Sequence, residues 1–177
     1  ADYSDEVMSI SAVIQHDGVA SGAESAVAVR FELAEKWHFY ASEETAPGGM
    51  NLKLDSSSDS DINFSEAIFP ESHLYFDEAS EQEIDVFSDD FTVYIPFTAD
   101  EELAAGDVKV KVGIDGAICS EMQCRFLPSG TSVEAVFEAV SDVSSMGDSK
   151  FEVPSVGEAA VGDGEGIKEE KLSYPLW

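Results

Sequence analysis

The feature of this sequence that most limits its fold is a series of short segments that alternate apolar and polar residues or are rich in Val, Ile and Phe. These segments are Val7–Gln15, Ala26–Leu33, Met50–Leu54, Phe91–Phe97, Val108–Ile114 and Val133–Phe137. A period of two residues is typical of β-strands, and no long amphipathic helix is evident. Turn-forming clusters separate the segments, among them "HDGVASG", "APGG", "DSSSDSD", "TADEELAAGD" and "LPSG". Seven or more short strands joined by such turns predict an all-β chain folded as a two-sheet antiparallel sandwich.

The chain length favours one folded domain followed by a tail. At 177 residues, 44% of them hydrophobic, the chain is long enough to bury one core. After Val140 the sequence becomes rich in Gly, Ser and acidic residues, and its apolar residues are scattered singly. We therefore expect a domain over residues 1–140 and a linker or tail over residues 141–177. The last residues, Tyr174 to Trp177, either pack back on the sandwich or begin a further segment.

The charge of the chain excludes several classes of partner. Nine Lys and Arg residues face 37 Asp and Glu residues, a formal net charge of -28. Such a chain repels phosphate backbones and anionic lipid, so nucleic acid is excluded as a partner. No Lys or Arg occurs between Leu54 and Val108. The acidic residues indicate either a well-solvated surface in a salty environment or an acidic docking face for a basic partner.

No apolar stretch approaches the length that spans a bilayer, so we expect no direct membrane insertion of this chain. The chain opens with Ala1-Asp2-Tyr3 and not with a charged and apolar leader. If the protein is exported, its signal peptide has already been removed. We expect a monomer.

A calcium loop is the first candidate for a metal site. The side chains at positions 1, 3, 5, 8, 9 and 12 of an EF-hand-like pattern would be Asp55, Ser57, Asp59, Ile62, Asn63 and Glu66. Position 6 of that pattern needs glycine and holds Ser60, so an acidic connection between strands is the better interpretation. The three histidines, His16, His38 and His73, are widely separated. We therefore predict no metal site and no cofactor.

The only two cysteines are Cys119 and Cys124, in the stretch "GAICSEMQCRF" directly after a predicted strand. A disulfide between them would close a very short loop and would stabilise the fold by roughly 2 kcal/mol, against nearly 5 for a hundred-residue loop. The spacing is not the C-x-x-C of a thioredoxin. The residues alone leave two readings open, a structural hairpin disulfide or a redox-active pair.

Four stretches in order carry a resemblance to a known family. They are "FELAEKWHFYAS", "APGG", "IFPESHLYFDEASEQEIDVFSDDFTVYIPF" and "VKVKVGIDGAICSEMQCRFLPSG". Over roughly residues 7 to 140 the chain resembles the N-terminal periplasmic domains of the DsbD family of thiol:disulfide interchange proteins. Members of that family commonly have a proline one or two residues after the second cysteine. Here Arg125, Phe126 and Leu127 precede Pro128.

The resemblance implies an immunoglobulin-like sandwich that acts as a thiol:disulfide oxidoreductase of the protein-disulfide reductase type. Such a periplasmic domain receives electrons from the membrane-embedded domain of its parent protein and passes them to oxidised partners. The implied partners are thioredoxin-like proteins, together with the membrane and thioredoxin-like domains of the parent. The alternative is a non-catalytic sandwich that binds a protein or carbohydrate and uses the disulfide structurally.

The resemblance also implies roles for individual residues. Cys124 matches the nucleophile that attacks the partner's disulfide, and Cys119 matches the resolving thiol. His38 and Tyr40 match polar aromatic neighbours of the cysteines, and their spacing of two places both on one side of a strand. Tyr75 and Phe76 match a loop that caps the cysteine pair with an aromatic ring, and Phe76 is the first choice for that ring.

Overall fold

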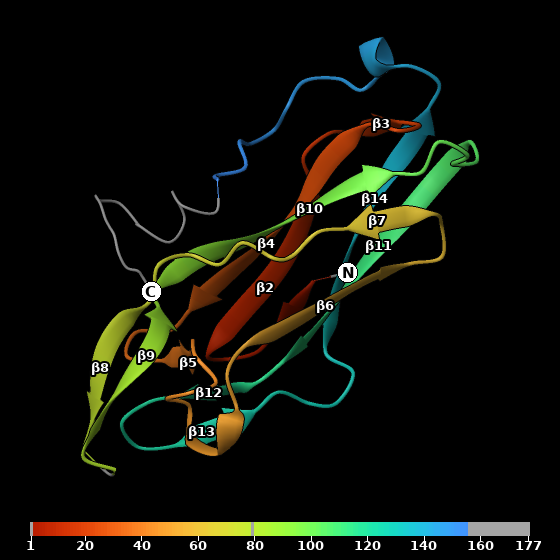
Figure 1. Ribbon diagram of the computed structural model, residues 1–177. Coiled ribbons are helices and arrows are strands. Elements are labelled where there is room, and N and C mark those ends of the chain that lie inside the picture. The colour runs from red at the N-terminus through yellow and green to blue at the C-terminus, as the bar shows by residue number, and fades with distance from the viewer. Residues whose placement is uncertain (1, 79, 156–177) are drawn as a thin grey trace.

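A computed structural model describes residues 2–78 and 80–155, and its architecture is an immunoglobulin-like β sandwich with a third, smaller sheet at one end (Figure 1). Sheet A has the order β1 (Tyr3–Ser4), β2 (Met8–Ile14), β4 (Glu24–Leu33), β10 (Asp90–Ala99) and β7 (Ile62–Phe64). Sheet B has the order β3 (Gly18–Ala20), β14 (Ser132–Val140), β11 (Gly106–Asp115) and β6 (Lys53–Ser58). Sheet C has the order β13 (Cys124–Phe126), β12 (Ala117–Cys119), β5 (His38–Tyr40), β9 (Gln82–Ser88) and β8 (His73–Asp77). The predicted all-β sandwich is confirmed.

The core lies between sheets A and B. The long strands β10, β11 and β14 alternate more buried and more exposed positions, because successive side chains of a strand point to opposite faces. The central strand β4 is buried on both faces from Ser25 to Val29. Phe97 of β10 and Phe137 of β14 stack across the two sheets with ring centroids 5.5 Å apart. All strand pairs in the described residues are antiparallel except that of β3 with β14, which is parallel.

Sheet C is built from continuations of both large sheets, because β4 leads into β5, β9 into β10 and β11 into β12. Gly116 makes the last of these connections at a φ of 139°. A Cβ atom at this position would lie 3.1 Å from the Asn51 carbonyl oxygen and 3.2 Å from Leu52 Cα, so only glycine fits without strain. The chain can therefore turn at residue 116 and carry both cysteines to the end of the sandwich (Figure 1).

Each face of sheet C packs against a different apolar cluster. One face contributes Phe39, Phe87 and Ile118 to the main core. The opposite face carries a second cluster, whose buried members are Tyr40, Ala46, Ile84, Val86, Ala117 and Cys119. Ala46 comes from the connection between β5 and β6, which contains the short 3-10 helix η1 (Pro47–Gly49). Cys119 is therefore part of a packed layer of its own, separate from the core between the large sheets.

Five of the six predicted segments correspond to β2, β4, β10, β11 and β14. The segment Met50–Leu54 was placed too early, since β6 spans Lys53–Ser58. This edge strand has the sequence Lys-Leu-Asp-Ser-Ser-Ser and lacks the apolar pattern of a buried strand. The stretch "ESHLYFDEAS", predicted as a loop, contains strand β8, which pairs with β9 in a hairpin.

Residues 141–155 contact the sandwich. They include the 3-10 helix η2 (Val143–Ser145), and Met146 is buried in the main core. The Lys150 amide donates to the Gln15 carbonyl at 2.9 Å, and the Phe151 ring lies 5.6 Å from that of Tyr94. The division into residues 1–140 and 141–177 stays a prediction, because residues 156–177, Tyr174 to Trp177 included, lie outside the described residues.

Candidate functional site

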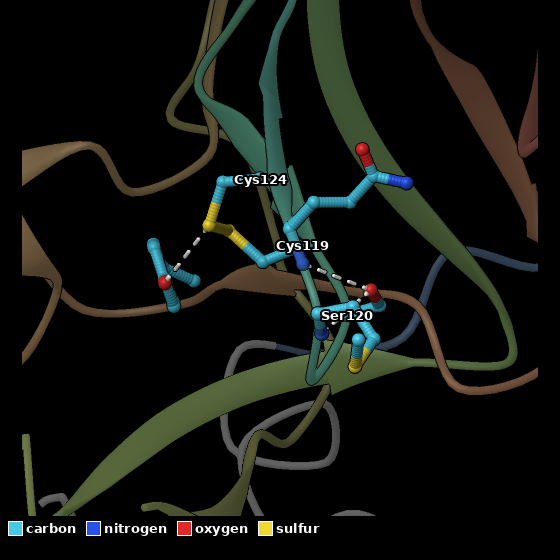
Figure 2. The surroundings of a disulfide bond; sticks show 6 residues. Cys119, Ser120 and Cys124 are labelled. Atoms are coloured by element: carbon cyan, nitrogen blue, oxygen red, sulfur yellow. Dashed lines mark hydrogen bonds between the residues drawn. A yellow bond between two sulfur atoms is a disulfide. The ribbon is translucent and has the colours of Figure 1, made fainter. Parts of the chain in front are cut away.

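The two cysteines face each other across the β12–β13 hairpin and are joined by a disulfide, with their Cα atoms 4.0 Å apart (Figure 2). The Ser120 amide donates to the Gln123 carbonyl at 2.8 Å and closes the turn between them. The next pair outward, Cys119 and Cys124, is therefore a non-hydrogen-bonded pair, the position where opposing side chains of an antiparallel ladder approach most closely. The hairpin register thus brings the sulfurs into bonding distance.

The two cysteines differ in exposure. Cys119 is 1% exposed because β12 lies inside sheet C, between β13 and β5. Cys124 is exposed because β13 is the edge strand. An incoming reagent can therefore reach the Cys124 sulfur more readily than the Cys119 sulfur.

The structure places His38 and Tyr40 on the face of sheet C that carries the cysteines. His38 lies directly opposite Cys119 in the β5–β12 register. The Tyr40 hydroxyl lies 3.6 Å from Cys124 Sγ, within the distance of a hydrogen bond to sulfur. Figure 2 marks a hydrogen bond to the Cys124 sulfur with a dashed line. Both side chains are buried. The structure thus places His38 and Tyr40 beside the cysteines, and their role in the site stays a prediction.

Burial changes the proton affinity of both side chains. Burial lowers the pKa of His38, the neighbouring His73 lowers it further, and Asp77 acts in the opposite direction. The pKa of Tyr40 is raised, chiefly by burial and then by the charges of Asp77 and Tyr75. Near neutral pH, Tyr40 is therefore protonated and can donate its hydroxyl hydrogen to a sulfur.

Tyr75, and not Phe76, lies on the cysteine side of β8. The Tyr75 ring is 4.4 Å from the His38 ring and packs against the cluster that contains Cys119. Phe76 is 56% exposed and points to the other face, because neighbouring residues of a strand alternate. The expected loop is a strand, so only one of the two rings can lie over the site. The structure favours Tyr75, where the sequence favoured Phe76.

A pocket of about 310 Å³ opens beside these rings. Its lining includes Trp37, His38, His73, Tyr75, Ser88 and Glu121. His73 Nε2 and the Ser88 hydroxyl are hydrogen-bonded at 3.0 Å. His73, Ser88 and Glu121 could not be assigned to the site from sequence, because no local pattern around them reveals that β8, β9 and the hairpin turn meet here.

Arg125 anchors β13 from the opposite face. Its guanidinium lies 5.6 Å from the centroid of the Trp37 ring, within the range of a cation–π interaction. Its Nη2 lies 2.5 Å from a carboxylate oxygen of Glu6. These contacts tie the edge strand to the segments that precede β5 and β2. In the sequence, Arg125 is distinctive only as a departure from the family pattern, in which a proline follows the second cysteine more closely.

The acidic stretch that was considered as a calcium loop forms part of the sandwich. Asp55 and Ser57 lie in β6, and Ile62 and Asn63 lie in β7, so the chain crosses here from sheet B to sheet A. Among residues 2–78 and 80–155, no group of three His, Cys, Asp or Glu side chains could hold a metal ion. In the same residues, no helix has the length and apolar character needed to cross a membrane.

Comparison with known proteins identifies relatives of the chain. A family model described as "Thiol:disulfide interchange protein DsbD, N-terminal" matches residues 7–135. No curated protein sequence matches the chain. The crystal structure of the N-terminal periplasmic domain of ScsB from Proteus mirabilis is similar with a TM-score of 0.50 and 11% identity, over 76% of this chain and 47% of that one. The chain thus spans about half the length of that structure, and the likeness shows the fold.

The N-terminal domain of DsbD from Neisseria meningitidis, crystallised in the reduced form, has a TM-score of 0.39 and 19% identity, over 69% of this chain and 81% of that one. The family model covers most of the chain, including both cysteines. A cysteine pair at disulfide distance fits a domain for thiol–disulfide exchange. The chain belongs to the family of DsbD N-terminal domains.

Proposed function

We propose that this chain is a periplasmic thiol:disulfide oxidoreductase domain that reduces the disulfides of partner proteins through Cys119 and Cys124. Its electrons come from a membrane-embedded domain of a larger parent protein, and residues 141–177, of which residues 141–155 pack against the sandwich, lead toward the rest of that protein. The partners are thioredoxin-like proteins, including the thioredoxin-like domain of the parent. Membership of the DsbD N-terminal family supports this assignment.

The difference in exposure between the two cysteines is the observation that carries the proposal. A thiolate that attacks a disulfide in another protein must be accessible, and Cys124 is exposed. The thiol that resolves the mixed disulfide needs to reach only its neighbour, and the buried Cys119 is directly opposite Cys124 in the hairpin. This arrangement supports Cys124 as the nucleophile and Cys119 as the resolving thiol.

The proposed reaction has two exchange steps that balance in atoms and electrons. The Cys124 thiolate attacks one sulfur of the partner's disulfide, a mixed disulfide forms, and the other partner sulfur leaves as a thiolate that takes up a proton. Cys119, after losing its proton, attacks Cys124 Sγ and releases the second partner thiol. The dithiol of this domain is thereby oxidised to a disulfide, and the partner's disulfide is reduced to a dithiol.

A redox titration separates this function from a structural role of the disulfide. Structural disulfides have reduction potentials below about -300 mV, whereas exchange-active pairs lie higher. We expect a value above this limit when the protein is equilibrated with buffers of reduced and oxidised dithiothreitol and its free thiols are alkylated and counted. A value well below the limit would favour the non-catalytic binding module.

Single cysteine variants test the assigned roles. With an oxidised thioredoxin-like protein, Cys119→Ser is expected to accumulate a mixed disulfide through Cys124, because the resolving thiol is missing. Cys124→Ser is expected not to accumulate one, because Cys119 is buried. Non-reducing gel electrophoresis after an acid quench measures both. Equal trapping by the two variants would contradict the assignment.

A further inference from the structure

The proposed exchange requires an acceptor for one buried proton. Cys119 must lose its thiol proton before it attacks Cys124 Sγ, and the side chain of Cys119 is 1% exposed. It belongs to the apolar cluster on one face of sheet C. A thiol in such surroundings ionises less readily than an exposed one, because burial disfavours the charged thiolate. Water has little access to this sulfur, so a neighbouring side chain has to take the proton.

His38 is the basic side chain next to Cys119. The two residues lie directly opposite each other in the β5–β12 register, so their side chains share one face of the sheet, with Cβ atoms roughly 4.5 to 5.5 Å apart. On its other side β12 pairs with β13, so main-chain hydrogen bonds hold β12 from both sides. This register does not depend on the disulfide. His38 therefore stays beside Cys119 when the two cysteines are reduced.

The imidazole of His38 is free to accept a proton. It is 4% exposed, yet it makes no hydrogen bond within the described residues, whereas the other two histidines of the chain are hydrogen-bonded to serine side chains. A buried polar group without such a bond is costly and uncommon in folded proteins. In the disulfide, Cys119 carries no hydrogen that the imidazole could accept. The reduced thiol supplies one.

The pocket of about 310 Å³ beside the site gives His38 a route to solvent. His38 is part of its lining, together with the polar side chains of His73, Ser88 and Glu121. A polar pocket of this size has room for several water molecules, which can carry a proton from the imidazole to bulk solvent. His38 therefore lies between the buried sulfur and the water that finally takes the proton.

The groups around His38 keep it neutral at pH 7. Burial lowers the pKa of His38, His73 lowers it further, and Asp77 acts in the opposite direction. A neutral imidazole can accept a proton, whereas an imidazolium cannot. The titratable groups that face the imidazole or line its pocket are His73, Tyr75 and Asp77 of β8, Tyr40 of β5, Glu121 of the hairpin turn, and Lys36 and Asp89.

From these observations we propose that His38 is the base that takes the thiol proton of Cys119 in the resolving step. The S–H bond of Cys119 breaks, the proton moves to the imidazole, and the electron pair left on sulfur forms the new bond to Cys124 Sγ. The partner's sulfur leaves with the electron pair of the mixed disulfide and takes up a proton from water. The imidazolium then releases its own proton to water in the pocket.

This transfer makes a buried cysteine reactive without leaving an isolated charge. The proton moves only to the neighbouring side chain, so the thiolate forms beside an imidazolium and the net charge of the apolar cluster and its surroundings does not change. The inference rests on the proposed function and adds the group that activates the resolving thiol.

Reaction of the reduced protein with dithiobis(nitrobenzoate) isolates the resolving step. Cys124 forms a mixed disulfide and releases one coloured thiolate, and Cys119 then releases the second in a first-order phase whose rate does not depend on the reagent concentration. In the unaltered protein this second rate is expected to stay constant from roughly pH 7 to 8.5, because proton transfer from Cys119 to a neutral His38 changes no net protonation. In His38→Gln it is expected to rise about thirtyfold over the same range, because Cys119 must then ionise to solvent.

The matched control is His16→Ala. His16 is hydrogen-bonded to Ser25 and lies outside sheet C, so this variant is expected to keep the constant rate of the unaltered protein.

Chemical rescue separates proton transfer from packing. His38→Ala opens a space next to the pocket that an added five-membered ring can enter. At pH 7, imidazole is expected to raise the second-phase rate of this variant about tenfold. Pyrazole has the same size and is a much weaker base, so it is expected to leave the rate unchanged.

The possible outcomes distinguish this proposal from the proposed function. Parallel pH profiles for the unaltered protein and His38→Gln, or equal rescue by imidazole and pyrazole, would overturn the role of His38 as a base. Release of only one coloured thiolate by the unaltered protein would instead overturn the proposed function, because Cys119 would then not resolve a mixed disulfide.

Discussion

At the scale of single residues, Tyr40 is the side chain placed to tune the attacking sulfur. Its hydroxyl is 3.6 Å from Cys124 Sγ, and burial keeps the hydroxyl protonated by raising its pKa. A hydrogen bond donated to a thiolate stabilises the charged form and so lowers the pKa of the thiol. The neighbouring His38 adds no positive charge that would stabilise the Cys124 thiolate near neutral pH, because burial lowers the pKa of its imidazole.

Replacing Tyr40 by Phe should therefore raise the pKa of Cys124 by roughly half a unit to one unit, since the hydrogen bond to the thiolate is lost. The rate of alkylation of Cys124 by iodoacetamide as a function of pH, measured in the Cys119→Ser background, gives this pKa. Tyr75→Phe is the matched control, because it also loses a phenolic hydroxyl but is expected to leave the pKa unchanged. An unchanged value in Tyr40→Phe would mean that the hydroxyl does not bind the thiolate.

At the scale of elements, the β8–β9 hairpin supplies the cover of the site. Register pairs Tyr75 with Ile84; Ile84 belongs to the cluster that contains Cys119, and Tyr75 packs against it. The Tyr75 ring also lies against His38, the cross-strand neighbour of Cys119. A rigid strand, and not a loop, thus holds the ring near the buried cysteine.

Removing the Tyr75 ring should expose that cysteine. In the reduced Cys124→Ser variant, Tyr75→Ala is expected to increase the rate of reaction of Cys119 with a small thiol reagent several-fold, whereas Phe76→Ala leaves it unchanged. Phe76 is the matched control, because its ring lies on the other face of the same strand. Equal rates for the two alanine variants would show that Tyr75 does not shield the site.

At the scale of the whole molecule, the net charge of -28 affects the rate at which the protein associates with any charged molecule. Acidic residues also lie near the site. Burial is the largest cause of the raised pKa of Tyr75, and the negative charges of Glu121, Asp77 and Glu78 raise it further. The resulting negative potential attracts cationic groups and is screened beyond about 8 Å at physiological ionic strength, compared with about 30 Å at 0.01 M.

A pair of small disulfides can measure this field. The reduced protein should react faster with cystamine, which carries two positive charges, than with neutral hydroxyethyl disulfide at low salt. The ratio of the two rates is expected to fall several-fold between roughly 0.01 M and 1 M sodium chloride. A ratio that does not depend on salt would favour solvation as the role of the acidic residues.

The sequence by itself determined the fold class, most of the long strands and the residues His38, Tyr40, Cys119 and Cys124 at the candidate site. The fold class, the strands and the cysteine pair follow from features local to the chain, namely an alternation of period two, turn residues between strands and the short spacing of the cysteines, whereas His38 and Tyr40 were implied by the resemblance to the family. Which of Tyr75 and Phe76 faces the cysteines, and that Arg125 anchors an edge strand, depended on the pairing of β8 with β9 and of β13 with β12. A shift of one residue in such a register moves every side chain of a strand to the other face, and no local pattern specifies the register between strands distant in the chain. Only the tertiary structure could therefore decide which side chains surround the disulfide and which strand edge stays open beside it.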